Sequence, residues 1–155
     1  LVYKFEKART EAERKAMVDL YLANLSYVNN WDLVDLSADK ILGAYLFNKD
    51  KGLLYQLARS NHLWKQRIAI MATFHFIKNH EFTDTLEIAG ILLHNKHDLI
   101  QKAVGWMLRE IGKRDLLTEL NFLKEHYRTM PRTMLRYAVE KFEPELRKKF
   151  LQGLI

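Results

Sequence analysis

The sequence of 155 residues has no cysteine, only two prolines and only six glycines. Without cysteine there are no disulfides and no thiolate chemistry, which fits a reducing compartment, and we expect a cytoplasmic protein. The scarcity of helix-breaking residues favours long helices. No run of about 18 apolar residues is present, so no membrane span is predicted. The opening residues LVYKFEKART are charged and lack the apolar centre of a signal peptide.

Charge is present in excess of one sign and is unevenly distributed. The formal net charge is +6. Residues 1–99 carry 13 basic and 12 acidic side chains, whereas residues 100–155 carry 12 and 7. A basic excess concentrated in the last third favours a polyanion such as nucleic acid as partner, although it also fits a merely soluble basic surface.

The hydrophobic pattern follows a helical period of 3.6 almost everywhere, and no segment alternates with period 2. Thr10 and Glu13 have the spacing of a capping box, Asp98 and Asp115 can each cap a helix, and Pro131 and Pro144 suit the first helical position. We expect an all-α chain with helices over residues 10–24, 30–46, 53–59, 61–77, 83–94, 98–113, 115–127 and 131–142, and a last helix from Pro144.

A weak internal repeat runs through these helices. The segments RIAI (67–70), KAVG (102–105) and YAVE (137–140) occupy similar points of successive helices, at spacings of 34 and 35 residues. Repeats of this length are typical of α-solenoids of the HEAT or armadillo type, in which antiparallel helix pairs present one concave face. We therefore predict a single helical-repeat domain over residues 1–155.

Trp106 lies away from the apolar stripe of its helix. Lys102, Arg109 and Lys113 are its neighbours at helical spacings on that side. Two interpretations stay open: the indole packs beneath a neighbouring repeat, or it forms an aromatic platform flanked by phosphate ligands, as on nucleic-acid-binding surfaces.

Asp35 and Arg67 are charged residues at the edges of apolar stripes. Trp31 and Asp35 project from the same side of one helix because they are four residues apart. A buried arginine needs an anionic partner, so Arg67 and Asp35 could form a buried ion pair between repeats. Alternatively, both line a cleft, with Asp35 facing developing positive charge and Arg67 facing a phosphate.

Other candidates carry weaker signals. His94 and His97 have a metal-like spacing, but no cysteine or matching carboxylate accompanies them, so we interpret them as surface histidines and predict no metal site. Arg132 and Arg136 follow Pro131 on a basic face where contact with phosphate is reasonable. No glycine-rich phosphate loop, serine nucleophile motif or dinucleotide fingerprint is present.

Four ordered segments together, NNWDLVD, LWKQRIAIM, IQKAVGWMLREIGK and MPRTMLRYAVEKF, resemble the DNA alkylation repair family, the AlkD-like alkylpurine DNA glycosylases. The resemblance extends from about residue 10 to the end. It implies HEAT-like repeats, a concave basic surface that binds double-stranded DNA, and excision of purines alkylated at N3 or N7. It also implies further N-terminal helices before Leu1, which we expect this chain to lack.

Matched position by position, the resemblance implies roles for the unusual residues. Asp35 would be the catalytic carboxylate, Trp31 and Trp106 the aromatic contacts to the lesion nucleotide, and Arg67 a cleft arginine that engages DNA near the lesion. From their positions on basic helix faces, and not from the resemblance, we also expect Lys102, Arg109, Lys113, Arg132 and Arg136 to contact the DNA backbone. The family needs no fitted base pocket and no metal or organic cofactor.

The leading hypothesis is therefore a monofunctional DNA glycosylase that acts on cationic alkylpurines in DNA, as a monomer associated with the nucleoid. The alternative is a non-catalytic HEAT-like scaffold that binds DNA or protein. Asp35 discriminates between the two, because a surface that only bound phosphates would be weakened by a carboxylate at its centre.

Overall fold

The structure is a computed structural model that describes all residues 1–155, and every regular element in it is helical. The chain forms twelve α-helices, one short 3-10 helix, η1, and one π-helix, η2. The elements are α1 (Val2–Lys7), α2 (Glu11–Ala23), η1 (Leu25–Tyr27), α3 (Trp31–Asp35), η2 (Asp39–Gly43), α4 (Ala44–Leu46), α5 (Gly52–Arg59), α6 (Leu63–Ala72), α7 (Phe74–Lys78), α8 (Thr83–Ile91), α9 (Asp98–Gly112), α10 (Leu116–His126), α11 (Arg132–Ala138) and α12 (Pro144–Gln152). None of the helices combines the length and apolarity that crossing a bilayer requires. The all-α prediction is confirmed.

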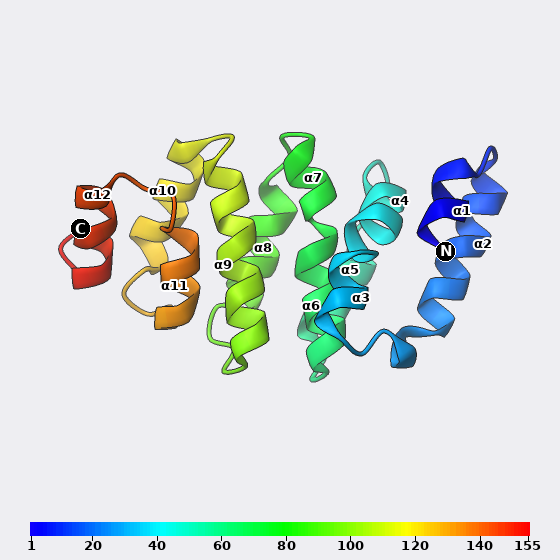
Figure 1. Cartoon of the computed structure of the whole chain (residues 1–155), viewed down its shortest axis with the longest axis horizontal. Helices are drawn as coiled ribbons and strands as arrows, with labels where there is room; N and C mark the ends of the chain where they lie inside the picture. The colour runs from blue at the N-terminus through cyan, green and yellow to red at the C-terminus, as the bar shows by residue number, and fades with distance from the viewer.

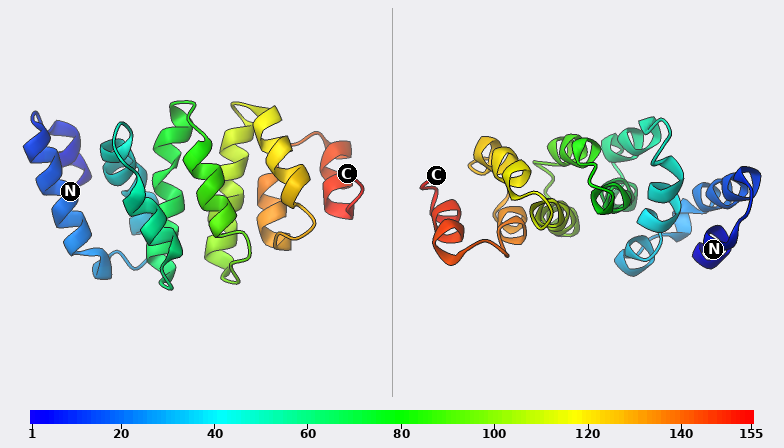
Figure 2. Two further views of the ribbon diagram at one scale, coloured as in Figure 1. Left: turned by 180° about the vertical axis from the view of Figure 1, so that it is seen from behind. Right: turned by 90° about the horizontal axis from the view of Figure 1, so that it is seen from above.

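Most helices stand side by side in two rows (Figures 1 and 2). The front row of Figure 1 contains α3, α6 with α7, α9, α11 and α12, and the row behind it contains α5, α8 and α10. Seen from above, the front row curves, and α3 and α12 lie further forward than α6 and α9 (Figure 2, right). This arrangement is consistent with an α-solenoid. One cluster of 37 buried hydrophobic side chains runs between the rows from Phe5 to Phe150.

Several helix ends follow the sequence prediction. In α2, Glu13 N–H donates to Thr10 Oγ1 at 3.1 Å, and the Glu13 carboxylate accepts from the Thr10 N–H, which completes the capping box. Asp115 caps α10 by accepting from the Thr118 N–H at 3.1 Å. Pro144 is the first residue of α12, and Gly153 ends that helix at φ 71°, where glycine is favoured.

Other boundaries were predicted wrongly. The expected helix 30–46 is interrupted after Asp35 and resumes as the π-helix η2 and α4. The expected helix 61–77 is divided at Thr73, whose hydroxyl donates to the Ile70 carbonyl and competes with the backbone ladder. The side chain of His97, and not that of Asp98, caps α9, and the side chain of His62 caps α6. Pro131 is the cap of α11 and not its first residue, and α1 was not predicted.

Two glycines allow neighbouring helices to approach closely. A Cβ on Gly43 would lie 2.3 Å from the Ala72 carbonyl oxygen, and a Cβ on Gly105 would lie 2.5 Å from that of Met134. Each glycine faces a residue 29 positions later in the chain. These two close approaches pack η2 against α6 and α9 against α11.

Candidate active site

Asp35 and Arg67 form an ion pair between α3 and α6. Arg67 Nε donates to Asp35 Oδ1 at 3.1 Å and Arg67 Nη2 donates to Oδ2 at 2.9 Å. The side chains are 6% exposed for Arg67 and 14% exposed for Asp35. The ion pair predicted as one of the two alternatives is present, and because a two-point guanidinium–carboxylate contact fixes both planes, the orientation of Asp35 is set by α6.

Arg67 also reaches the next helix of the front row. Its Nη1 donates to the backbone carbonyl of Leu99, the second residue of α9. Arg67 lies 32 residues after Asp35 and 32 residues before Leu99. The Arg67 side chain therefore links three successive front-row helices. The carbonyl of Leu99 could not have been identified from the sequence, because any residue carries the same group.

Trp31 lies at the start of α3, one turn before Asp35, and is 55% exposed. Its helix begins at Asn30, whose side chain accepts from the Asp32 N–H at 2.7 Å. An indole exposed to this extent contributes little to a core. The structure thus presents a large exposed aromatic surface on the helix that carries Asp35, one turn before that residue.

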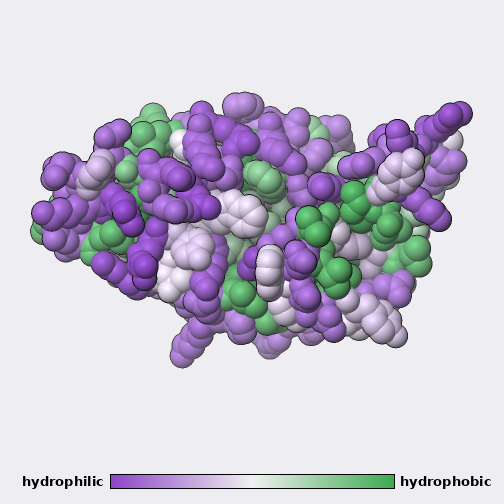
Figure 3. All heavy atoms as spheres, in the orientation of Figure 1, coloured by the Kyte–Doolittle hydropathy of each residue, from purple (hydrophilic) through white to green (hydrophobic).

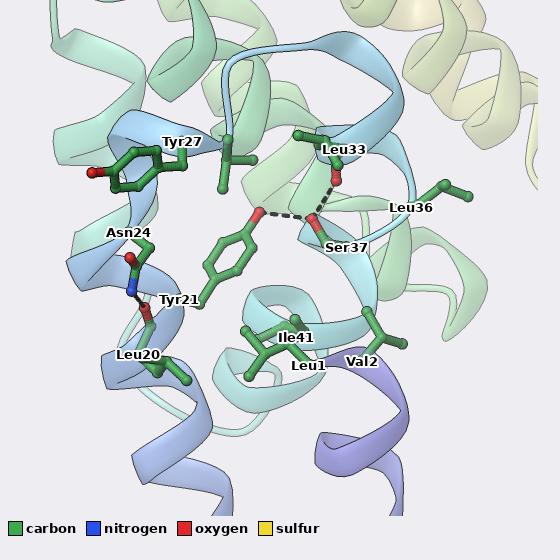
Figure 4. Close-up of a pocket in the computed structure, with 11 residues that line it drawn as sticks. Leu1, Val2, Leu20, Tyr21, Asn24, Tyr27, Leu33, Leu36, Ser37 and Ile41 are labelled. Atoms are coloured by element: carbon green, nitrogen blue, oxygen red, sulfur yellow. Dashed lines mark hydrogen bonds between the residues drawn. The ribbon is translucent and has the colours of Figure 1, made fainter.

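The end of α3 is supported from α2. Tyr21, which is buried, forms a 2.9 Å hydrogen bond with Ser37, and the Ser37 hydroxyl donates to the Leu33 carbonyl (Figure 4). Ser37 lies two residues after Asp35, in the turn before the π-helix η2. Single turns of π-helix are frequent at functional sites, where they change the direction of a side chain. Neither Tyr21 nor Ser37 was singled out in the sequence.

An apolar groove of about 530 Å³ adjoins this region on the side of α1 and α2. Leu33 and Leu36, on either side of Asp35 in the sequence, line it together with Tyr27, and all three are exposed (Figure 4). Hydrophobic side chains gather over this end of the molecule in Figure 3. The lining includes neither Asp35 nor Arg67.

Trp106 is half-buried in α9. Its ring lies 6.2 Å from that of Phe74, and its Nε1 donates to Glu110 Oε1 at 3.3 Å. Glu110 also accepts from Lys113 and Arg114. Burial alone would raise the pKa of Glu110, but these hydrogen bonds outweigh burial and lower it. Packing against a neighbouring helix, one of the two alternatives for Trp106, is therefore observed, and Glu110 is a partner that sequence reasoning missed.

The three cations around Trp106 each contact a carboxylate. Lys102 pairs with Asp98 at 2.7 Å, Lys113 with Glu110 at 2.8 Å, and Arg109 with Glu140 of the segment after α11. The side chains of Lys102 and Lys113 are partly exposed, so these two ion pairs contribute little to the stability of the fold.

Two further predicted contacts lie on α11. Arg132 is exposed and its Nη1 donates to the Leu151 carbonyl at the end of α12. Arg136 is exposed and lines a polar hollow of about 380 Å³ with Arg109, Glu140 and Arg147. Arg147 was not singled out in the sequence, although it lies on a short basic helix. His94 and His97 are exposed, and the His97 ring caps α9.

The protein is all-helical, with two rows of helices around one core. Its candidate site lies on the front row and combines an ion-paired carboxylate with an exposed tryptophan. The family model described as DNA alkylation repair enzyme matches residues 1–142, and the chain belongs to that family. Membership indicates a role in DNA repair, with DNA as partner. No match was found among the curated proteins.

Proposed function

We propose that this protein is a DNA glycosylase that hydrolyses the N-glycosidic bond of purines alkylated at N3 or N7. The observation that carries the proposal is the carboxylate of Asp35, which Arg67 holds in a fixed orientation at the surface one turn from the exposed Trp31. Such a carboxylate can stabilise positive charge that develops on a deoxyribose.

The reaction suits the residues present. An alkylpurine cation is a good leaving group, so the C1′–N bond can break without a general acid and the base departs as a neutral purine. Asp35 stabilises the oxocarbenium-like sugar and accepts a hydrogen bond from the water that attacks C1′; the water's proton passes to Asp35 or to solvent. Each carboxylate oxygen keeps a free lone pair beside its bond from Arg67, so the ion pair does not block this role.

Arg67 serves this reaction as a positioning residue, because three of its nitrogens already donate within the protein and only 5% of the residue is exposed. Trp31 offers its ring face to the sugar or to the cationic base through cation–π contact. Trp106, half-buried on α9, would offer a second aromatic surface to the DNA. The predicted contact of Arg67 with DNA stays a prediction.

DNA would lie along the curved front row, which we propose to be the basic concave face of a HEAT-like solenoid. Lys102 and Arg109 lie on α9 of that row, Lys113 directly follows α9, and Arg132 and Arg136 lie on α11. Their contacts with backbone phosphates would supply affinity without sequence specificity. A monomer acting on chromosomal DNA in the cytoplasm is sufficient for this function.

The test is release of 7-methylguanine and 3-methyladenine from methylated duplex DNA by the protein and by its Asp35→Asn variant. Asp32→Asn is the matched control, because Asp32 is an exposed carboxylate of the same helix without an ion pair. We expect release that Asp35→Asn lowers by at least about a hundredfold and Asp32→Asn leaves within about twofold. DNA binding by Asp35→Asn should be equal or tighter.

Unchanged release by Asp35→Asn would remove this carboxylate from the mechanism. Absence of release from the unaltered protein, with DNA binding intact, would favour the non-catalytic scaffold. Melting temperatures of both variants separate loss of chemistry from loss of fold, since Arg67 loses an anionic partner when Asp35 is replaced.

A further inference from the structure

Two adjoining hollows form a groove at the last two helices of the front row, α11 and α12 (Figure 1). One hollow, of about 380 Å³, lies between α9, α11 and α12. The other, of about 580 Å³, lies between α11, α12 and the segment that joins them. The two hollows share Glu140 and Arg147, and no residue of the back row lines either of them. This α11–α12 groove therefore belongs to the surface of the front row.

The α11–α12 groove carries positive charge in large excess. Its charged residues are one carboxylate and five cations: Glu140, Arg109, Arg132, Arg136, Arg147 and Lys148. Arg109 pairs with Glu140, and Arg132 donates to the carbonyl of Leu151. The other three cations are exposed, and their side chains form no ion pair or hydrogen bond within the protein. These three side chains are therefore accessible to an anion from solution.

The helix α12 is packed firmly against the rest of the molecule. Phe150 is 1% exposed, and its ring lies 5.4 Å from that of Tyr127 and 5.7 Å from that of Phe142. Gly153 ends the helix in the left-handed conformation. Because these contacts fix the rotation of α12 about its axis, they also determine which of its side chains face the groove.

One face of α12 lines the groove and another does not. Four of the lining residues share a face, because they are three and four positions apart: Pro144, Arg147, Lys148 and Leu151. Glu145 and Lys149 are exposed, lie four positions apart and line neither hollow. The same short helix thus offers charged residues inside the groove and matched charged residues outside it.

We propose that the α11–α12 groove binds the backbone of duplex DNA, with phosphates contacted by Arg136, Arg147 and Lys148. Duplex DNA carries one negative charge per about 1.7 Å of its axis, so exposed cations on two adjacent helices can contact neighbouring phosphates. An open hollow without buried polar groups suits such a backbone better than a single small ion. The inference rests on the DNA binding of the proposed function and not on its chemistry.

The proposal extends the DNA-binding face beyond the residues that family membership covers. The match to the family model ends at residue 142, whereas α12 begins at Pro144. Arg147 and Lys148 therefore have no assigned role, and their contact with DNA follows from the groove alone. Since α12 is the last helix of the front row, these contacts would lie at the opposite end of the row from Asp35 (Figure 1).

Glu140 gives the proposal a second, opposite signature. It is the one carboxylate in either hollow, and its side chain is 49% exposed. A negative charge at this position repels phosphates that bind to the neighbouring cations. Removing the charge of Glu140 should therefore strengthen DNA binding, whereas removing the charge of Arg147 or Lys148 should weaken it.

The test is fluorescence anisotropy with the full chain and unmodified duplex DNA, over a series of KCl concentrations. Arg147→Gln and Lys148→Gln should each weaken binding about fivefold near 0.15 M salt. Each should also reduce the slope of log K against log salt concentration by about one, as the loss of one phosphate contact does. Arg147→Lys keeps the charge and should retain the slope.

Lys149→Gln is the matched control for Lys148→Gln, because it makes the same change of charge on the next residue of α12. Its affinity should stay within about twofold of that of the unaltered protein, and its slope should not change. Equal losses for the two lysine variants would show that only net charge matters and would overturn the proposal. Unchanged slopes for both Arg147→Gln and Lys148→Gln would overturn it as well, as would the absence of DNA binding by the unaltered protein.

Glu140→Gln should tighten DNA binding by about two- to fivefold, and Glu145→Gln on the outer face of α12 is its control. Equal affinities for these two variants would contradict the placement of phosphates in the groove. Melting temperatures check that every variant is folded. Binding to unmodified DNA involves no excision, so absence of alkylpurine release together with these binding changes would refute the glycosylase reaction alone.

Discussion

Arg67 donates to both carboxylate oxygens of Asp35 and, through its remaining terminal nitrogen, to the carbonyl of Leu99. One guanidinium therefore joins α3, α6 and α9 at the point where the front row carries the candidate site. This contact has two separable consequences: it stabilises the packing of three helices, and it fixes the direction of the Asp35 carboxylate.

Removing Arg67 should affect both consequences. Arg67→Ala leaves the mostly buried carboxylate of Asp35 without its partner, so we expect the free energy of unfolding to fall by about 3 kcal/mol. Alkylpurine release, measured well below the melting temperature, should fall as well. A double-mutant cycle with Asp35→Asn in urea should give a coupling energy of at least about 1 kcal/mol. Additive effects on stability would show that the pair contributes nothing beyond its separate members.

The two tryptophans should respond differently to truncation. Trp31→Ala removes a side chain that is 55% exposed, so stability should change by less than about 0.5 kcal/mol while excision falls strongly. Trp106→Ala removes contacts with Phe74 and the hydrogen bond to Glu110, and should destabilise by about 2–3 kcal/mol.

Trp106→Phe separates the functions of that indole. It keeps an aromatic face and loses only the donor to Glu110, so most of the excision rate should remain. Thermal denaturation and single-turnover excision measure the two quantities on the same preparations. A loss of stability for Trp31→Ala as large as that for Trp106→Ala would contradict the exposed placement of Trp31.

Local chemistry explains which parts of the fold could be predicted. The capping box of Thr10 and Glu13, the Asp115 cap and Pro144 act within one turn, so their spacing is sufficient. The division of helix 30–46 could not be predicted, because the buried residues on both sides of the break, Val34, Ala38, Ile41 and Leu42, keep the spacing of a continuous α-helix. It depends instead on tertiary contacts such as the approach of Gly43 to Ala72.

The candidate site shows the same limit. Asp35 and Arg67 could be matched because each is a charge on an apolar stripe and each needs a partner. The Asp98–Lys102 and Glu110–Lys113 pairs had helical spacings that would have revealed them. Glu119 carried a signal too, since Phe122 and Leu123, three and four residues later, are both buried.

Replacing either of two glycines by alanine should change stability in opposite directions, because only Gly105 lies where α9 closely approaches α11. Gly105→Ala places a Cβ 2.5 Å from the Met134 carbonyl oxygen and 2.5 Å from Tyr137 Cβ, so it should destabilise by about 1–3 kcal/mol. Gly90→Ala in α8 meets nothing within 4 Å and should stabilise by about 0.5–1 kcal/mol, through helix propensity alone. Urea denaturation of both variants checks the signs, and equal stabilisation by both would refute the close contact.

Glu119 makes the stability of the protein depend on pH in a defined direction. Burial raises its pKa to about 9 from an ordinary value of 4.5, with Arg109 opposing the shift. Between these values the unfolded chain releases the proton and the folded chain keeps it. The stability that this group contributes is therefore full below pH 4.5 and declines as pH rises, by up to about 1.4 kcal/mol per pH unit.

The variant Glu119→Gln cannot ionise at this position. Its stability should match that of the unaltered protein near pH 4.5 and exceed it progressively toward pH 8. Urea denaturation at several pH values measures the difference, with Glu125→Gln as the exposed control on the same helix. Parallel profiles for Glu119→Gln and the unaltered protein would mean that Glu119 is ionised in the fold, and Arg109 would then have to face it as a charge partner.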